Sequence, residues 1–426
     1  MKHCFFFLWD GASYSLFKAL LEQGSLPNIQ KYLLSSGEFK KIYTSFPSTT
    51  GPAYLPFLTG KTPGECNIPG IRWFDKEAYH LKKKRFSRSY VGYHSFSINH
   101  DITKNTKSLF HYFDHSFNLY NPISLGLSHS SKNKISWIKS IYSPTAHFSG
   151  RWLWVDQRIS QSFLKSIPLK PTFVFCVFPG IDGTAHHFGL QSKKLKEAYR
   201  RADHYFGDIL DKHIRLNDPH FENTLVIATS DHGLSDTHSH FDLSQFLEKQ
   251  KQKVFYYPKI WRKKFQYSVM PSGNAMAHLY FTDRKERVFY ETLADEHKWI
   301  LQMLLEQDAV DWIAMKSKER GIVTLNYSEA PPSIDGRGQG GGWQSQYPDM
   351  DFQLSSLFQS PRCGDVVICA KKGFDLRDQF EFPKHKASHG SLIPEHMEIP
   401  LCSNKKLILE DVRSMNVFTE IIKNMV

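Results

Sequence analysis

The sequence is short of the features that mark secreted and membrane proteins. Its 426 residues include only six Cys, and no two of them form a Cys-x-x-Cys pair. A disulfide framework or a zinc site built on Cys is therefore not expected. The N-terminal apolar run ends at Asp10 and is too short for a secretory signal, and no stretch approaches the ~20 apolar residues of a membrane span. We expect a soluble protein that stays in the cytoplasm.

Acidic residues are also scarce relative to basic ones. The 54 Lys and Arg outnumber the 42 Asp and Glu, which gives a formal charge of +12. This excess predicts an anionic substrate or partner. Apolar residues make up 41% and charged residues 23%, values that exclude wholesale disorder, collagen-like repeats and coiled coil. His is abundant, with 21 copies, and this justifies a search for metal ligands.

Short apolar runs alternate with helical periods along the chain. The expected strands are Cys4 to Trp9, Lys41 to Ser45, Thr172 to Phe178, Thr224 to Thr229, Ala277 to Thr282 and Asp365 to Ala370. The expected helices include Tyr14 to Gln23, Pro27 to Leu34 and Lys193 to Leu216. Continuous apolar strands indicate that both faces of a sheet are covered. We therefore predict a single α/β domain over residues 1–426, with a doubly wound, mostly parallel sheet flanked by helices.

Three segments interrupt this alternation. Residues 76–153 are rich in Ser, Asn, His and aromatics with weak periodicity, and we interpret them as a cap insertion. Residues 247–273 form a second irregular block, a basic and aromatic insertion. Residues 335–342 are rich in Gly but lack the Lys-Ser/Thr of a phosphate-binding loop, so we predict a flexible surface loop there.

Polar side chains that can bind metals follow several of the predicted strands. Asp10 directly follows the first strand, Asp182 and His186 lie four residues apart after another, and Asp231-His232 directly follows a third. His389 lies in a later Ser-His-Gly loop. In doubly wound folds the carboxyl ends of the strands form the ligand site, so we expect these groups to meet there. Each one alone is equally compatible with a solvated Asp or a structural His.

The segment that follows the second predicted strand supplies a hydroxyl. Thr49 and Thr50 precede Pro52, which suits the first turn of a helix. Unpaired N–H groups at that end would favour a bound phosphate, although either Thr taken alone is explained as a helix cap.

The donors together suit a pair of metal ions. Six nitrogen and oxygen ligands exceed the four of tetrahedral zinc, but they give each of two ions three ligands and an open position. Two ions about 4 Å apart can stabilise both the attacking and the leaving oxygen of a phosphoryl displacement. One of them would also lower the pKa of a Thr hydroxyl and make it a nucleophile. We expect two divalent ions, with zinc preferred and manganese or magnesium as alternatives.

The order of these motifs, from Asp10 to His389, resembles the alkaline phosphatase superfamily, most closely its type I phosphodiesterase and nucleotide pyrophosphatase branch. The resemblance implies that the nucleophile precedes a short helix ending in Thr-Gly, here Thr59-Gly60. This spacing places the nucleophile, which also binds metal, at Thr50. The implied metal ligands are Asp10, Asp231 and His232 for one ion, and Asp182, His186 and His389 for the other.

The sequence departs from the branch where substrate would bind. Some members of the branch carry an Asn about twenty residues after the nucleophile, and the nearest counted position here is Ile71. Asn67 or Arg72 is the candidate replacement, and an Arg would favour a doubly charged monoester. His238 and His240 are further candidates for substrate binding or for support of the ligands, with a solvated loop His as the equal alternative.

The predicted function is hydrolysis of an anionic phosphate ester or nucleotide, as a phosphodiesterase or nucleotide pyrophosphatase that forms a phospho-threonine intermediate. A phosphomonoesterase or a phosphomutase-like enzyme is the alternative within the superfamily. The alternative from another class is a nucleic-acid or membrane-surface binding protein. It would use Lys82 to Arg85 and the basic residues of 249–265, which are accompanied by Phe255, Tyr256, Tyr257 and Trp261.

Overall fold

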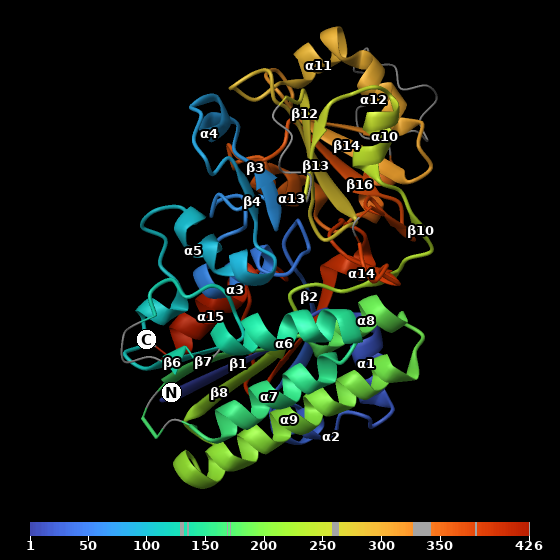
Figure 1. Cartoon of the computed structure of the whole chain (residues 1–426). Helices are drawn as coiled ribbons and strands as arrows, with labels where there is room; N and C mark the ends of the chain where they lie inside the picture. The colour runs from blue at the N-terminus through green and yellow to red at the C-terminus, as the bar shows by residue number, and fades with distance from the viewer. Residues whose placement is uncertain are drawn as a thin grey trace.

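The computed structural model describes residues 1–127, 132–133, 136–167, 169–170, 172–257, 264–326, 342–379 and 381–425. A seven-stranded sheet in the order β2-β19-β8-β1-β7-β5-β6 forms its larger lobe (Figure 1). The strands are β1 (His3–Trp9), β2 (Glu38–Tyr43), β5 (Ser116–Leu119), β6 (Lys132–Asn133), β7 (Thr172–Phe178), β8 (Thr224–Thr229) and β19 (Glu398–Ser403). Only β19 runs against its neighbours, so the prediction of a mostly parallel central sheet is confirmed.

The central strand β1 is apolar from Cys4 to Trp9 because both of its faces are covered. Phe5 and Phe7 pack on the helices of one face, with ring centroids 6.1 Å from Phe163 and 4.9 Å from Phe206. Phe6, which points to the other face, lies 5.2 Å from the ring of Phe57. Successive side chains of a strand alternate between faces, so a strand with helices on both sides is apolar at every position.

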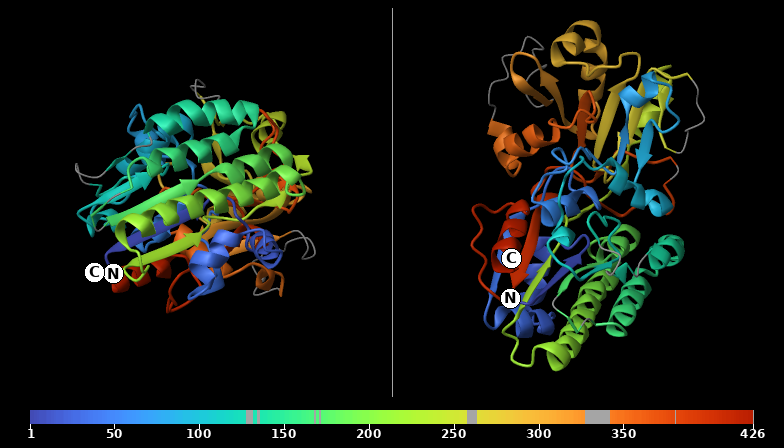
Figure 2. Two further views of the ribbon diagram at one scale, coloured as in Figure 1. Left: turned by 90° about the horizontal axis from the view of Figure 1, so that it is seen from below. Right: turned by 90° about the vertical axis from the view of Figure 1, so that its left-hand side faces the viewer.

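Helices cover both faces of this sheet (Figures 1 and 2). The first face carries α1 (Tyr14–Glu22), α2 (Pro27–Ile29), α6 (Ser136–Ser149), α7 (Trp152–Leu164), α8 (Gly180–Phe188) and α9 (Lys193–Asn217). The second face carries α3 (Leu55–Thr59) and α15 (Met415–Met425). The doubly wound arrangement predicted from the sequence is therefore present.

A second sheet of six strands, which the sequence analysis did not anticipate, forms the smaller lobe (Figure 1). Its order is β11 (Val254–Phe255), β12 (Tyr267–Pro271), β13 (Met276–Phe281), β16 (Val366–Ala370), β14 (Val310–Ser317) and β15 (Gly321–Asn326). The helices beside it are α10 (Leu243–Lys249), α11 (Tyr290–Glu296), α12 (Lys298–Leu305) and α13 (Met350–Leu357). Strands β13 and β16 were predicted from continuous apolar runs, and here they pair antiparallel with each other. Their alternate side chains enter separate apolar clusters, so burial on both faces again produces the continuous pattern.

The three segments set apart in the sequence have different places in the fold. Residues 76–153 contain α4 (Lys76–His80), β4 (Ser87–Ser89) and α5 (Ile98–Asp101), but they also supply β5, β6 and α6 to the larger lobe. Strand β4 pairs with β3 (Arg72–Phe74). Residues 247–273 supply β11 and β12 to the second sheet. Residues 335–341 of the predicted flexible loop lie outside the described residues.

The structure separates the charged and aromatic parts of the basic segments. Lys249, Lys251 and Lys253 are exposed, but Phe255 and Tyr256 are buried in the apolar core. Trp261 lies outside the described residues. In the described part, the surface beside these lysines therefore lacks two of the aromatic rings that the binding hypothesis used.

The two chain ends lie together at one edge of the larger lobe (Figure 2). The amino group of Met1 donates to the main-chain oxygen of Asn424 at 3.2 Å. No helix in the described ranges is long and apolar enough to cross a bilayer.

Candidate metal centre

The polar residues that follow the predicted strands meet at one end of the central sheet. Asp10 directly follows β1, Asp182 lies on α8 just after β7, and Asp231 and His232 follow β8. Because β8, β1 and β7 are adjacent, the three carboxylates start from neighbouring strands. Main-chain hydrogen bonds fix the strand ends, since Asp10 N donates to Phe178 O and Asp182 N to Asp10 O, each at 3.0 Å.

Thr50 joins the group formed by Asp10, Asp231 and His232. Its Oγ1 lies 3.2 Å from Oδ1 of Asp10 and 3.1 Å from Nε2 of His232. The same Nε2 atom lies 3.5 Å from Asp10 Oδ1 and 3.3 Å from Asp231 Oδ2. Asp10, Asp231 and His232 are buried and each offers a ligand atom within 4.8 Å of the others. The structure thus brings together the three side chains that the resemblance assigned to one ion, with Thr50 beside them.

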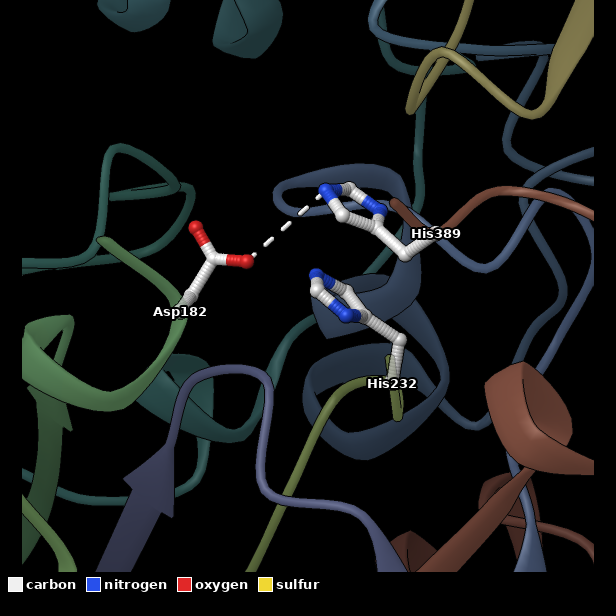
Figure 3. A group of neighbouring side chains, drawn as sticks. All are labelled: Asp182, His232 and His389. Carbon is white, nitrogen blue, oxygen red and sulfur yellow. Dashed lines mark ion pairs between the residues drawn. The ribbon is translucent and has the colours of Figure 1, made fainter. Parts of the chain in front are cut away.

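The carboxylate of Asp182 points toward the rings of His232 and His389 (Figure 3). Its Oδ1 lies 3.1 Å from Nε2 of His186 and 3.9 Å from Nε2 of His389. The rings of His232 and His389 are stacked with centroids 3.8 Å apart, so the two groups adjoin. Ligand atoms of Asp182, His232 and His389 lie within 4.8 Å of one another, which makes His232 common to both groups. This sharing is a refinement of the predicted division into two separate sets.

Each of the three imidazoles is oriented by a main-chain carbonyl. The Nδ1 atom lies 2.7 Å from Ala387 O in His186, 3.1 Å from Gly233 O in His232 and 2.9 Å from Ser48 O in His389. A carbonyl only accepts hydrogen bonds, so Nδ1 carries the hydrogen and Nε2 of the neutral ring keeps its lone pair. All three Nε2 atoms face the carboxylates, which is the arrangement of metal-binding His.

The electrostatics of the site also suit cations. Burial, reinforced by Asp231 and Asp182, raises the pKa of Asp10 well above its usual value, and burial followed by Asp182 does the same for Asp231. Burial lowers the pKa of His232 and of His389, which favours their neutral form. Oδ1 of Asp182 and Oδ2 of Asp231 are buried and have no hydrogen bond of standard geometry with a described residue. The donor set therefore fits divalent cations, which supply the positive charge that the carboxylates need.

His186 differs from the other two imidazoles. Burial acts to lower its pKa, but the carboxylate of Asp182 outweighs burial and raises the pKa to about 9. In return, His186 and His389 overcome the effect of burial on Asp182 and lower the pKa of that carboxyl. The attraction that holds a proton between Asp182 and His186 would equally attract a metal ion.

Several residues that support the site were not singled out from the sequence. The hydroxyl of Tyr54 donates to Asp10 Oδ2 at 3.0 Å, and Ser48 Oγ accepts from Gly390 N at 3.1 Å beside His389. Gly11 has a φ of +76°, and a Cβ there would lie 2.9 Å from Cβ of Asp182. Tyr54 follows Thr50 at the one-turn spacing of a helix, and this spacing was the signal that could have revealed it.

The candidates for substrate binding lie in other networks. Ser360 Oγ donates to Oδ1 of Asn67 at 2.7 Å. Arg72 Nη1 donates to Pro271 O at 3.4 Å, and burial, with a contribution from Arg377, lowers the pKa of Arg72 to about 9. The described contacts therefore do not bring Asn67 or Arg72 to Thr50, and their roles stay predictions.

The two remaining His candidates lie in different surroundings. His238 lines a cavity of about 690 Å³ beside Gly11 and Gly373, and none of the predicted metal ligands lines that cavity. His240, in the short strand β10 (Ser239–His240), faces Glu381 and Asp375 instead.

Comparisons with known proteins identify the family and the fold of the chain. The family described as type I phosphodiesterase / nucleotide pyrophosphatase matches residues 5–392. Phosphonoacetate hydrolase from Sinorhizobium meliloti 1021 has a similar fold, with a TM-score of 0.61 and 13% identity over 99% of this chain and 95% of that chain. Murine ectonucleotide pyrophosphatase / phosphodiesterase 5 gives a TM-score of 0.59 and 15% identity over 100% of this chain and 95% of that chain. The human protein of that name gives 0.61 and 13% with the same coverage. No curated protein matches.

At these sequence identities the solved structures show only a shared fold. The family of this chain is shown by the match to the family as a whole. It spans both lobes and includes every strand end at the site from Asp10 to His389. The chain therefore belongs to the type I phosphodiesterase / nucleotide pyrophosphatase family, within the alkaline phosphatase superfamily, and it is a metal-dependent hydrolase of phosphoric ester bonds.

Proposed function

We propose that this enzyme hydrolyses phosphodiester or nucleotide pyrophosphate bonds with Thr50 as the nucleophile. The observation that carries the proposal is the position of Thr50 Oγ1, within 3.2 Å of both Asp10 Oδ1 and His232 Nε2. Asp10, Thr50, Asp231 and His232 would hold one divalent ion, and Asp182, His186 and His389 the other. Such ions, when bound, lower the pKa of a coordinated hydroxyl and neutralise charge on the phosphate oxygens.

The proposed reaction at Thr50 has two steps. The hydroxyl of Thr50 donates its hydrogen to Asp10 Oδ1, which directs a lone pair of Oγ1 away from that carboxylate. Attack on phosphorus forms the Thr50 O–P bond and breaks the bond to the leaving oxygen. The proton lost from the Thr50 hydroxyl passes to the leaving oxygen, which departs as an alcohol or nucleotide. Water then breaks the Thr50 O–P bond, releasing the phosphate product and restoring the hydroxyl.

Two observations support a Thr nucleophile and an anionic substrate. A solved structure holds murine ectonucleotide pyrophosphatase / phosphodiesterase 5, made inactive by a threonine-to-alanine substitution, in complex with AMP. The net charge of +12 on this chain would draw an anionic ester toward the site. We propose zinc as the ion, because imidazole and carboxylate ligands suit it, with manganese or magnesium as alternatives. The cytoplasm stays the proposed location.

A preference for diesters rests on the surroundings of Thr50. A monoester dianion requires an additional cationic group at the phosphate, and the described hydrogen bond of Arg72 is made to Pro271 O instead. Phosphomonoesterase and phosphomutase-like activities remain the alternatives.

A panel of substrates tests the proposed function. It contains a nitrophenyl phosphodiester, a nitrophenyl phosphomonoester, a dinucleoside pyrophosphate and phosphonoacetate, each assayed with added Zn²⁺, Mn²⁺ or Mg²⁺. We expect kcat/KM to be highest for the diester or the pyrophosphate and to disappear after chelation. A higher kcat/KM for the monoester would establish the alternative, and cleavage of phosphonoacetate alone would overturn the assignment to phosphoric esters.

A further inference from the structure

A second cluster of buried ionisable side chains lies near the predicted metal centre but outside it. His240, Asp375 and Glu381 come from β10, β17 (Phe374–Asp375) and the loop after β17. Each offers one ligand atom within 4.8 Å of the others. Only His240 was a candidate in the sequence, because the two acids lie more than a hundred residues further along the chain. The parallel pair β10 and β17 brings the three side chains together.

The distances within this cluster are those of groups that share one cation. Nδ1 of His240 lies 3.1 Å from Glu381 Oε2 and 3.7 Å from Asp375 Oδ2. The main-chain oxygen of Arg377 lies 3.2 Å from the same Nδ1 and accepts its hydrogen, so a cation bound here takes the place of that hydrogen and gains the carbonyl as a further oxygen ligand. Two carboxylates, one imidazole and one carbonyl make a donor set of mixed oxygen and nitrogen atoms, which suits Mn²⁺ or Zn²⁺.

The protein itself leaves part of this donor set unused. The side chains of Asp375 and Glu381 are 0% and 2% exposed. Asn274 Nδ2 donates to Asp375 Oδ2 at 3.3 Å and also to Glu381 Oε1. Asp375 Oδ1 has no hydrogen bond of standard geometry with a described residue, and Glu381 Oε2 has only its contact with His240 Nδ1. Buried carboxylate oxygens without donors are unfavourable unless a cation or a proton neutralises them.

Both carboxylates of the cluster have histidines as ion-pair partners. In the described ranges these partners are His240 for Asp375, and His240 and His385 for Glu381. Burial and the neighbouring Glu381 raise the pKa of Asp375 to about 7. The protons that neutralise this cluster are therefore exchangeable, and a cation can take their place.

We propose that His240, Asp375 and Glu381 form a third divalent cation site that binds Mn²⁺ or Zn²⁺ independently of the centre at Thr50. The cation joins β10, which follows the Asp231-His232 segment, to the loop that precedes His389. Asn274 forms an isolated bridge with His389, and the ring of His385 lies 4.0 Å from that of His186. The third cation therefore lies beside the segments that carry His186 and His389, but it is held by ligands of its own.

Metal binding to the whole chain tests this site. The chelated protein is dialysed against excess Mn²⁺ alone, and in parallel against Zn²⁺ alone, and the bound metal is measured. We expect three equivalents for the wild type and two for Glu381→Gln, a change that keeps the shape of the side chain. Asp182→Asn should also bind two, and the double variant one, because the sites are separate. His240→Gln provides a second variant if Glu381→Gln does not fold, as judged by circular dichroism.

The location of the cation provides the decisive control. Anomalous scattering from a crystal soaked in Mn²⁺ should show a peak among His240, Asp375 and Glu381 in the wild type and none in Glu381→Gln. A wild type that binds only two equivalents, with no peak at the cluster, would mean that the cluster holds protons alone and would overturn the proposal. That result would not affect the role proposed for Thr50. Conversely, evidence against the Thr50 nucleophile would not remove the anomalous peak among His240, Asp375 and Glu381.

Discussion

Replacing Thr50 with Ala should lower kcat for the preferred substrate by roughly 10³-fold or more, because the variant has no atom that can form the bond to phosphorus. The bound metal should stay equal to that of the wild type, since Asp10, Asp231 and His232 remain in place around the lost hydroxyl. Steady-state kinetics and metal analysis on the same preparation measure both quantities. Thr50→Ser, which keeps a hydroxyl, should recover a substantial part of the lost rate.

The neighbouring residue offers a matched control for this prediction. Thr49 is buried, and its Oγ1 has no hydrogen bond of standard geometry with a described residue. Thr49→Ala therefore removes the same hydroxyl and methyl groups one position away. This variant should retain activity close to the wild type. Loss of activity in Thr49→Ala together with full activity in Thr50→Ala would exchange the two assignments. Full activity in both variants would exclude a Thr nucleophile altogether.

Asp182→Asn should remove one equivalent of bound metal and nearly all activity. Oδ1 of Asp182 is the atom that faces both His186 and His389, and an amide is a much weaker ligand than a carboxylate. We expect metal affinity at this position to fall by more than about 100-fold, because even residues that only orient a ligand change affinity by 10- to 100-fold. Equilibrium dialysis at fixed free Zn²⁺, with the wild type alongside, measures the loss.

A second buried carboxyl provides the control for this substitution. Asp156 lies on α7, and its Oδ1 accepts a hydrogen bond from Gly180 N at 3.0 Å. Burial raises the pKa of Asp156 well above its usual value, which favours the neutral carboxyl, and the amide oxygen of Asp156→Asn can accept the same hydrogen bond. This variant should keep the metal and the activity. Equal metal content in Asp182→Asn and Asp156→Asn would contradict the ligand role of Asp182.

The sequence predicted the core of the fold because local patterns carry that information. Strands β7 and β8 have the predicted bounds, and the carboxyl ends of β1, β7 and β8 hold the polar residues named in advance. The second sheet was missed because an antiparallel sheet buried on both faces has the same continuous apolar strands as a parallel one. Pairing between β13 and β16 joins segments about ninety residues apart, and periodicity contains no signal for such pairs.

The candidate site was predictable to the extent that its ligands follow strands. Ser48 and the cluster of Asp375 with Glu381 depend on contacts between distant segments, which a single sequence does not reveal. The surplus of His has a similar explanation, because some of these residues serve as buried hydrogen-bonding groups. His213 Nε2 lies 2.9 Å from Thr224 Oγ1, and His278 Nε2 lies 2.9 Å from Pro69 O. The abundance of His in the sequence is therefore not a measure of the number of metal ligands.

The central claim is that Thr50 forms a covalent intermediate, and the stereochemical course at phosphorus tests it most directly. The measurement uses a phosphorothioate diester of one configuration, hydrolysed in ¹⁸O-labelled water, with the configuration of the product determined by NMR. Attack by Thr50 followed by attack of water gives two inversions, so the mechanism predicts net retention. Net inversion would show that water attacks the substrate directly, and it would contradict the role assigned to Thr50.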